Sequence, residues 1–365
     1  MASRWLAVDK TLFFATIALI AFGLIMVYSA SFPLSESRWG TGSHFVLRQG
    51  IAALVGLLVM IAAVLIDYRN YRRPIVVGSA VLATIAGLIV VFTMPTIGGA
   101  HRWIPLAGFN VQPSEIAKLT VILFLASHLA RKDQRINDLW YGLAPAASVV
   151  ALIVLLVAIE RDLGTASMIV FLAGIMLWVA GLSWKFIAQI GAGGRVLGAV
   201  QILRTGYQWD RITAFLDPWA DPGGAGYQTV QSLIAVGSGG LTGEGLAAGK
   251  QKLFFLPAAH TDFMFSIVGE ELGLLGAVTV LLGFLVIVWR GARAALRAPD
   301  RFGFYLGIGL TTFVILQALV NMSIVVNLLP TTGIPLPFVS YGGSSMVVCC
   351  AAIGVLLNLS QHGHA

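Results

Sequence analysis

Three carboxylates lie within ten positions of the stretch Lys250–Gly273, KQKLFFLPAAHTDFMFSIVGEELG, and they are the side chains best suited to chemistry. Asp262 stands just before an apolar run, and Glu270 and Glu271 end it. A carboxylate beside an apolar segment is unfavourable unless it is paired, hydrated or used. Asp262 is therefore either a reactive group or the N-cap of a helix that starts at Phe263. Glu270 and Glu271 can likewise be satisfied inside a helical bundle.

A second charged pair lies in Gln112–Lys118, QPSEIAK. Glu115 and Lys118 are three residues apart, so one helical face carries both. They are either a mutually neutralising pair inside the membrane, which adds little net stability, or Lys118 faces a cavity and binds an anionic group.

Two further strings combine charge or glycine with the ends of helices. ERDLGTAS, Glu160–Ser167, fits a solvated interfacial cluster, and an N-cap role of Asp162 for the sixth helix explains it equally well. In GIPLPFVSYGGSS, Gly333–Ser345, two prolines keep the backbone extended and two glycines permit close approach. Its helix-start N–H groups, with nearby serines, suit an anion such as pyrophosphate. The alternative is a purely structural re-entrant turn.

Several catalytic classes find no support in the motifs. Gly243–Lys250 lacks the first glycine of a P-loop and the hydroxyl residue after its lysine, although a glycine run can still cradle a phosphate with its amides. No H-E-x-x-H, C-x-x-C or nucleophile-elbow pattern occurs, which gives no basis for metal hydrolysis or Ser or Cys nucleophiles. The adjacent Cys349 and Cys350 predict small buried residues, with no disulfide framework.

The composition predicts the kind of protein that positions these residues. Of 365 residues, 58% are hydrophobic and 11% are charged, against about 25% charged in soluble domains. Mean hydropathy is +0.88, as expected of a polytopic membrane protein. The net charge of +7 is no sign of nucleic-acid binding, because the basic residues lie between apolar runs.

Apolar runs long enough to cross a bilayer predict an all-α fold of ten transmembrane helices. They fall near 11–32, 45–66, 75–93, 115–130, 140–159, 166–183, 185–203, 263–289, 304–326 and 341–359. Thirteen of the 23 Lys and Arg lie in the segments on one side, which places both termini in the cytoplasm. The first run is too long for a signal-peptide core and is retained as a span. A large extracytoplasmic loop, about 204–262, joins helices seven and eight.

In order along the chain, the strings resemble the SEDS family of shape, elongation, division and sporulation proteins. They are YSAS, GGAHRWI with QPSEIAK, RDLGTA, GYQTVQSLIAVGSGG, AHTDFMFSIVGEELG and GIPLPFVSYGGSS. DPWADPGGAGYQ, KQKLFFLP and GEELG are more similar to the cell-division branch, FtsW, than to the elongation branch, RodA. The resemblance covers nearly the whole of residues 1–365, as one membrane domain.

The resemblance implies a peptidoglycan glycosyltransferase that polymerises lipid II into β-1,4 strands outside the bacterial cytoplasmic membrane, at the division septum. It implies a class B penicillin-binding transpeptidase and other divisome proteins as partners, and undecaprenyl pyrophosphate as leaving group. Asp262 matches the family's essential carboxylate. Ala258 and Phe254 replace glutamates usual in the family, so a second acid of that loop is missing.

The chemistry needs a base for the acceptor hydroxyl and cations for the departing pyrophosphate. We expect Asp262 to be the base, and a divalent cation (Mg²⁺ or Mn²⁺) could assist, although no ligand cluster demands one. The alternatives are a lipid II flippase, which needs no base, and a scaffold that only docks the transpeptidase. The expected substrate-binding residues are Lys118, Arg102, Glu115, Asp162, His260, Thr261, Ser340, Gly342, Gly343, Ser344, Lys250 and Lys252.

Overall fold

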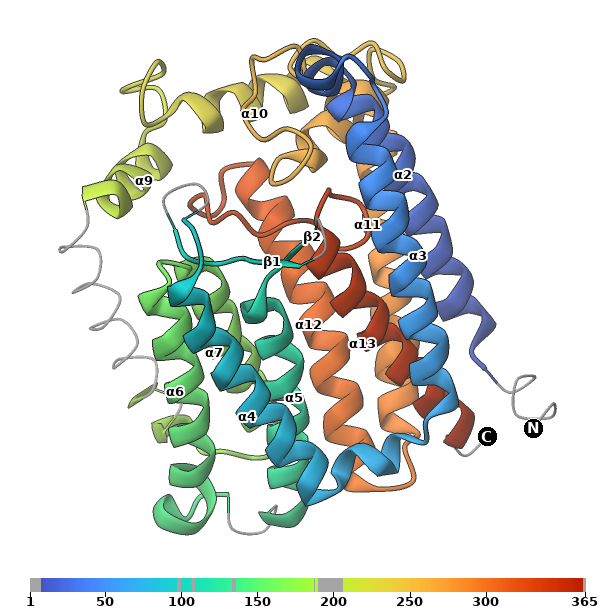
Figure 1. The fold of residues 1–365 in the computed structure, drawn as a ribbon, viewed down its shortest axis with the longest axis vertical. Helices are drawn as coiled ribbons and strands as arrows, with labels where there is room; N and C mark the ends of the chain where they lie inside the picture. Colours follow the sequence, from blue (N-terminus) through green and yellow to red (C-terminus); the bar gives the residue numbers. More distant parts are fainter. Residues whose placement is uncertain are drawn as a thin grey trace.

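The protein is a bundle of long apolar helices capped at one end by shorter helices and loops (Figure 1). The computed structural model describes residues 8–96, 100–106, 109–132, 136–186, 188–189 and 206–363, with side chains omitted at 206–208. Within these residues, eight helices are long and apolar enough to span a membrane, and α7 is a shorter apolar helix of 17 residues. The bundle helices are α2 (Lys10–Trp39), α3 (His44–Leu65), α4 (Pro74–Val90), α5 (Pro113–Lys132), α6 (Ala144–Ile159), α7 (Leu163–Val179), α11 (Met264–Leu296), α12 (Arg301–Val325) and α13 (Gly343–His362).

Nine of the ten expected spans correspond to these helices, so the predicted all-α polytopic fold is confirmed. The seventh, 185–203, falls almost entirely outside the described residues. Two predicted ends were wrong: α2 continues through Pro33 to Trp39 instead of ending near residue 32, and α11 continues to Leu296 instead of ending near residue 289. A single proline removes one helical hydrogen bond, and α2 ends only where Gly40 adopts a left-handed conformation, with φ 65°.

Helices α5, α12 and α13 form the centre of the bundle. In their most apolar windows 67%, 61% and 67% of residues are buried, against 22% for α4. Small residues bring helices together where lipid supplies no hydrophobic drive. Gly354 of α13 packs on the backbone of Met60 in α3, and Cys350 packs on Gly56. Both cysteines are fully buried and unpaired, as the sequence predicts.

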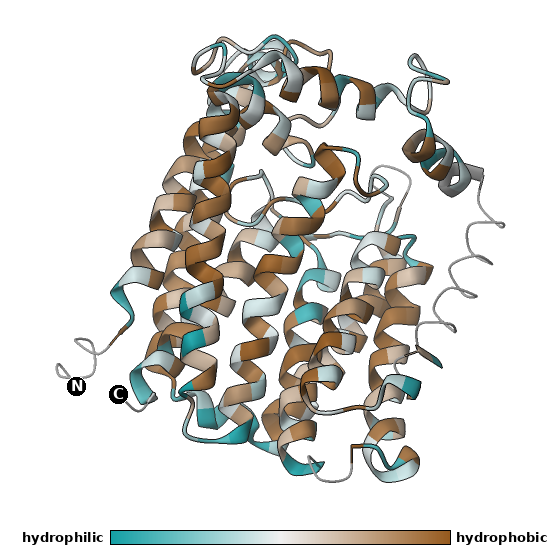
Figure 2. Cartoon of the chain, turned by 180° about the vertical axis from the view of Figure 1, so that it is seen from behind, coloured by the Kyte–Doolittle hydropathy of each residue, from teal (hydrophilic) through white to brown (hydrophobic). Residues whose placement is uncertain are grey.

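Both described ends of the chain lie at the same end of the bundle (Figure 1). The Asp9 carboxylate caps α2 and accepts a 2.6 Å bond from Arg290 Nε of α11, while its backbone N–H donates to Ser360 Oγ of α13. Figure 2 shows apolar residues along the helices and hydrophilic residues gathered at this end. The arginines here identify the cytoplasmic side by the positive-inside rule.

The opposite, outward end carries the short elements of the fold. Helices α9 (Gly206–Leu216) and α10 (Tyr227–Ser238) lie across the bundle there, so the long loop has structure of its own (Figure 1). A small antiparallel hairpin, which the sequence analysis did not anticipate, pairs β1 (Ile104–Leu106) with β2 (Phe109–Val111). Short turns of other helix types are η1 (Tyr68–Arg72), η2 (Val91–Thr93) and η4 (Leu139–Leu143).

Candidate active site

Asp262 lies at the outward end of the bundle, two residues before α11, and does not cap that helix. The N-cap position is Phe263, and no side chain caps α11. The main chain of Asp262 is fixed instead, because Asn321 Nδ2 of α12 donates to its carbonyl at 2.7 Å. The residue as a whole is half-buried. The capping interpretation is therefore wrong, and the carboxylate is available for another role.

The surroundings of Asp262 raise the pKa of its carboxyl towards the range of a general base. Burial raises the pKa of its carboxyl to about 6. Among the opposing effects, the positive charge of Arg211 is the largest, followed by the Thr261 hydrogen bond and the charge of Arg102. A carboxylate with this pKa is ionised at neutral pH and still accepts a proton readily.

Two arginines from different outward segments therefore act on Asp262. Arg102 comes from the segment before β1, and its guanidinium donates to the Arg161 carbonyl in the turn between α6 and α7. Arg211 lies on α9, in the long outward loop. Sequence reasoning named Arg102 but missed Arg211; the neighbouring tryptophan and acids were its only signal.

Asp162 is the N-cap of α7 and also ties that helix to the start of α5. Its Oδ1 accepts from Thr165 N at 3.2 Å, and its Oδ2 accepts from Gln112 Nε2 at 3.0 Å. It is 3% exposed, and its charge raises the pKa of Asp262. The structure thus brings the predicted Arg102, Asp162 and Asp262 together, with Asp162 in a positioning rather than an open role.

Glu160 is a buried acid beside this cluster. It is 1% exposed, and neither carboxylate oxygen has a hydrogen-bond partner among the described residues. Burial, followed by the charge of Asp162, raises the pKa of its carboxyl to about 8, with Arg102 opposing. The interpretation of this motif as a solvated interfacial cluster is therefore wrong for Glu160, which is neutral at pH 7.

Lys118 and Glu115 lie deeper, between α5 and α12, as a closed ion pair. Lys118 Nζ is 2.7 Å from Glu115 Oε1 and 2.8 Å from Gln317 Oε1, and it lies over the ring of Phe313. Lys118 has no exposed surface. Gln317 Nε2 continues the network to Ser345 Oγ at 2.8 Å. This arrangement matches the mutually neutralising pair rather than a lysine open to a ligand.

The Gly333–Ser345 segment is held mainly by hydrogen bonds within the protein. Ser344 Oγ accepts from Gln112 N and donates to the Asn110 carbonyl of β2. The helix-start N–H of Gly342 donates to Gln49 Oε1 at 3.1 Å, and Ser340 Oγ accepts from Leu336 N. Gly343 opens α13. These contacts match the structural re-entrant turn, which also joins the loop that carries Asp262, because Tyr341 N donates to the His260 carbonyl at 2.9 Å.

His260 and Thr261 support the loop that carries Asp262. The His260 ring packs between Phe45 and Tyr341, with centroids 4.6 and 5.7 Å away. Burial, assisted by the charge of Arg38, lowers the pKa of His260 to about 4, so the imidazole is neutral. Thr261 Oγ1 donates to the carbonyl of Ala258, which has a left-handed φ of 56°.

Glu270 and Glu271 fasten the glycine-rich loop 239–252 to α11. Glu270 Oε1 accepts from the backbone of Lys250 at 2.7 Å and of Gln251 at 3.1 Å. Glu271 accepts from Lys252 Nζ at 2.6 Å and from the Ser29 hydroxyl. These backbone amides are already bonded within the protein, so the loop is not arranged as an anion cradle.

The two lysines of this loop differ in exposure. Lys252 is 8% exposed and bonded to Glu271, whereas Lys250 is largely exposed and pairs with Glu244 at 3.2 Å. Of the expected cations, therefore, the structure brings only Arg102 close enough to influence Asp262.

Taken together, the geometry defines a multi-pass membrane protein with an acid–arginine site at its outward end. The chain belongs to the cell cycle protein family of FtsW, RodA and SpoVE, whose model matches residues 10–365. This confirms the resemblance to SEDS proteins.

Known relatives match over nearly their full length. The chain is 43% identical to a probable peptidoglycan glycosyltransferase FtsW of Geobacter metallireducens, over 96% of this chain and 94% of the relative. It is 40% identical to stage V sporulation protein E of Bacillus subtilis, over 99% of both. A chain of a peptidoglycan synthase complex superposes with a TM-score of 0.79 at 26% identity, over 98% of both. RodA of Thermus thermophilus superposes with a TM-score of 0.72 at 25% identity, over 99% of both.

Proposed function

We propose that the chain polymerises lipid II into β-1,4 glycan strands at the outer face of the bacterial cytoplasmic membrane, as a peptidoglycan glycosyltransferase of the division septum. Similarity over the full length to proteins named FtsW supports the activity and the division branch. The proposal treats residues 1–365 as a single SEDS-type membrane domain.

One observation carries the catalytic assignment: a half-buried aspartate, free of capping bonds, is held by its main chain, and the charges of two arginines lower the pKa of its carboxyl. In the proposed step Asp262 takes the proton of the acceptor 4-hydroxyl as that oxygen attacks C1 of the donor sugar. The bond from C1 to the pyrophosphate oxygen breaks, and its electron pair leaves with undecaprenyl pyrophosphate. Attack opposite the leaving group converts an α to a β linkage. General base catalysis of this kind is worth roughly 10²–10⁴-fold.

Arg102 and Arg211 are proposed to stabilise the negative charge that develops on the pyrophosphate. They lie close enough to lower the pKa of Asp262, so a phosphate beside that carboxylate falls within their field. Lys118 and Lys252 are left out of the proposed site because each is buried and already bonded to a glutamate. Lys250 is left out because its side chain is exposed and paired with Glu244.

A divalent cation, Mg²⁺ or Mn²⁺, is given no step in this scheme. Among the described residues, no three His, Cys, Asp or Glu side chains lie together so as to hold a metal ion. For the partner, we propose a class B penicillin-binding transpeptidase with other divisome membrane proteins. The similarity to a chain from a peptidoglycan synthase complex supports this assignment.

The test is polymerisation of fluorescent lipid II by the purified chain together with its cognate transpeptidase, read as glycan length on a gel. Wild type, Asp262→Asn and a control, Asp217→Asn, which alters an exposed acid of the long loop, are compared after matched folding checks. Polymer from wild type and control but none from Asp262→Asn is the expected result. Equal polymer from all three would remove Asp262 as the base. No polymer from a folded wild-type complex, with lipid II transfer across vesicles intact, would favour a flippase.

A further inference from the structure

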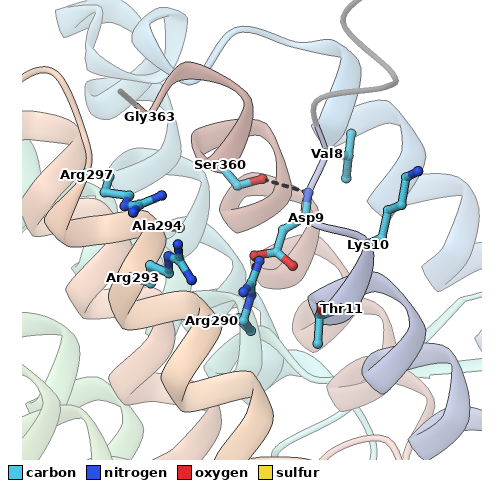
Figure 3. Close-up of a pocket in the computed structure, with 10 residues that line it drawn as sticks. All are labelled: Val8, Asp9, Lys10, Thr11, Arg290, Arg293, Ala294, Arg297, Ser360 and Gly363. Carbon is cyan, nitrogen blue, oxygen red and sulfur yellow. Dashed lines mark hydrogen bonds and ion pairs between the residues drawn. The ribbon is translucent and has the colours of Figure 1, made fainter. Parts of the chain in front are cut away.

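A pocket of about 390 Å³ lies at the cytoplasmic end, where the start of α2 meets the ends of α11 and α13 (Figure 3). It is remote from the outward site. Its lining includes Lys10, Arg290, Arg293 and Arg297, with Asp9 as the one acid. Pockets of this size are typical of small-ligand and headgroup sites.

The positive charge of this pocket is only partly neutralised within the protein. Asp9 is bonded to Arg290, with Nε to Oδ2 at 2.6 Å. Within the described ranges, Lys10, Arg293 and Arg297 have no hydrogen bond or ion pair from their side chains. Three cations that have no counter-charge among the described residues thus line one pocket, and their mutual repulsion favours binding of an anion.

The three arginines share one face of α11. Positions 290, 293 and 297 follow the helical repeat, and Figure 3 shows their side chains projecting from α11 towards Asp9 and Ser360. The positive-inside rule requires basic residues on this side of the membrane but not their convergence on a pocket. Membrane topology alone therefore does not explain why these arginines line one pocket, and binding of an anionic ligand would explain it.

Exposed apolar residues on the same helix point to a lipid as the source of that anion. Trp289 is 60% exposed with Arg290 packed against its ring, and Leu296 is 71% exposed. Exposed tryptophan and basic residues at a helix end are typical of the membrane interface. Guanidinium groups bind phosphate oxygens in pairs, and basic pockets between transmembrane helices on this side suit phosphate headgroups.

We propose that this pocket binds the phosphate of an anionic phospholipid of the inner leaflet, with acyl chains running along the exposed face of α11. Arg293 and Arg297 provide the counter-charges, while Arg290 is held in place by Asp9. The assignment does not depend on the proposed enzymatic activity.

The test measures lipid binding to the purified full-length protein in neutral detergent. Thermal stability is followed during titration with short-chain phosphatidylglycerol, short-chain phosphatidylcholine and inorganic phosphate. The variant is Arg293→Gln with Arg297→Gln. The control is Arg72→Gln with Arg73→Gln, which removes the same charge from exposed positions at the same end. The variant should fold normally without lipid, since it loses only unpaired like charges.

Phosphatidylglycerol is expected to stabilise wild type and control, and phosphatidylcholine to have little effect. The pocket variant should bind phosphatidylglycerol about 25-fold more weakly, since each of the two arginines near an anionic headgroup contributes about a factor of five. If phosphatidylglycerol binding weakens equally in the variant and the control, the lipid is attracted by general surface charge and the pocket proposal is wrong. Saturation by inorganic phosphate at the same concentration as the lipid would overturn the lipid source. Absence of any stabilisation of wild type would overturn the site itself.

Discussion

Asn321 of α12 holds the main chain of Asp262 and that of Ile334 with one amide group. Its Nδ2 donates to the Asp262 carbonyl at 2.7 Å and to the Ile334 carbonyl at 2.8 Å. The side chain is fully buried. Two irregular outward segments, far apart in sequence, thereby acquire a fixed relation to one helix of the central bundle. The position of the proposed base depends on this amide.

Replacing Asn321 by leucine is expected to reduce turnover of folded protein by about tenfold or more, because small misplacements of a catalytic group are costly. Asn358→Leu is the matched control. Asn358 is also buried and accepts from Tyr68 N and donates to the Val64 carbonyl, at the cytoplasmic end. Both variants should lose thermal stability, but only Asn321→Leu should lose polymerisation per folded molecule. Equal activities in the two variants would contradict a positioning role.

The rate of polymerisation should follow the ionisation of Asp262. With the pKa of this carboxyl at about 6, kcat/KM is expected to be half-maximal near pH 6 and to fall about tenfold per pH unit below pH 5. Arg211→Gln should move the midpoint to higher pH, because the charge of Arg211 lowers this pKa. Arg301→Gln, at the cytoplasmic end of α12, should leave it unchanged. If the midpoint pH is the same in Arg211→Gln and wild type, the group that titrates is not Asp262.

Glu160→Gln is expected to stabilise the protein at neutral and alkaline pH. The folded-state pKa of this acid, about 8, lies above its ordinary value of 4.5. Between these values the unfolded chain releases a proton that the folded chain keeps, so wild-type stability falls as pH rises. The melting temperature of Glu160→Gln should exceed that of wild type by about 2 °C or more at pH 8. The difference should vanish near pH 4.5, and a constant difference across pH would contradict the burial of an unpaired acid.

Lys252→Met leaves the buried Glu271 without its cation and should lower the free energy of unfolding by about 3–5 kcal/mol. Adding Glu271→Gln should restore part of the loss, because no buried charge then remains unpaired. Lys250→Met breaks an exposed pair and should cost about 1 kcal/mol or less. Denaturation of the four proteins under one set of conditions gives the comparison. Equal losses for the two lysine variants would contradict the structural role of Lys252.

Gly243→Ala and Gly240→Ala separate steric clash from backbone strain. Both glycines have a left-handed φ, 81° and 53°, so alanine at either costs about 1 kcal/mol. A Cβ at Gly243 would also overlap the carbonyl of Glu271, whereas one at Gly240 meets no atom within 4 Å. Gly243→Ala should therefore lower the melting temperature clearly more than Gly240→Ala. Equal shifts would mean that the loop does not press on α11.

The sequence predicts the membrane helices because each depends on the composition of one continuous segment. Asp162 as a cap is predicted equally well, because its partner Thr165 is three residues away. The partners of Glu271 and Asn321 lie far off in sequence, so local patterns give no account of them. Arg211 was missed for the same reason: only the folded loop brings α9 near Asp262. Irregular segments joined by single hydrogen bonds have no hydrophobic periodicity from which their contacts could be predicted.

The break in α11 at Gly273 has φ 64° and ψ −159°, and the glycine loop bonds to both sides of it. Glu244 N and Gly245 N donate to the carbonyls of Glu270 and Glu271 before the break, and Leu274 N and Leu275 N donate to Gly240 and Leu241 after it. These bonds on both sides of Gly273 make the bend rigid, so it does not act as a hinge. Asp262, which precedes α11, is thereby held in a fixed position relative to the part of α11 that follows Gly273. In the proposed reaction, a substrate anchored in the membrane by its lipid tail would therefore meet the Asp262 carboxylate at a fixed distance from the membrane surface.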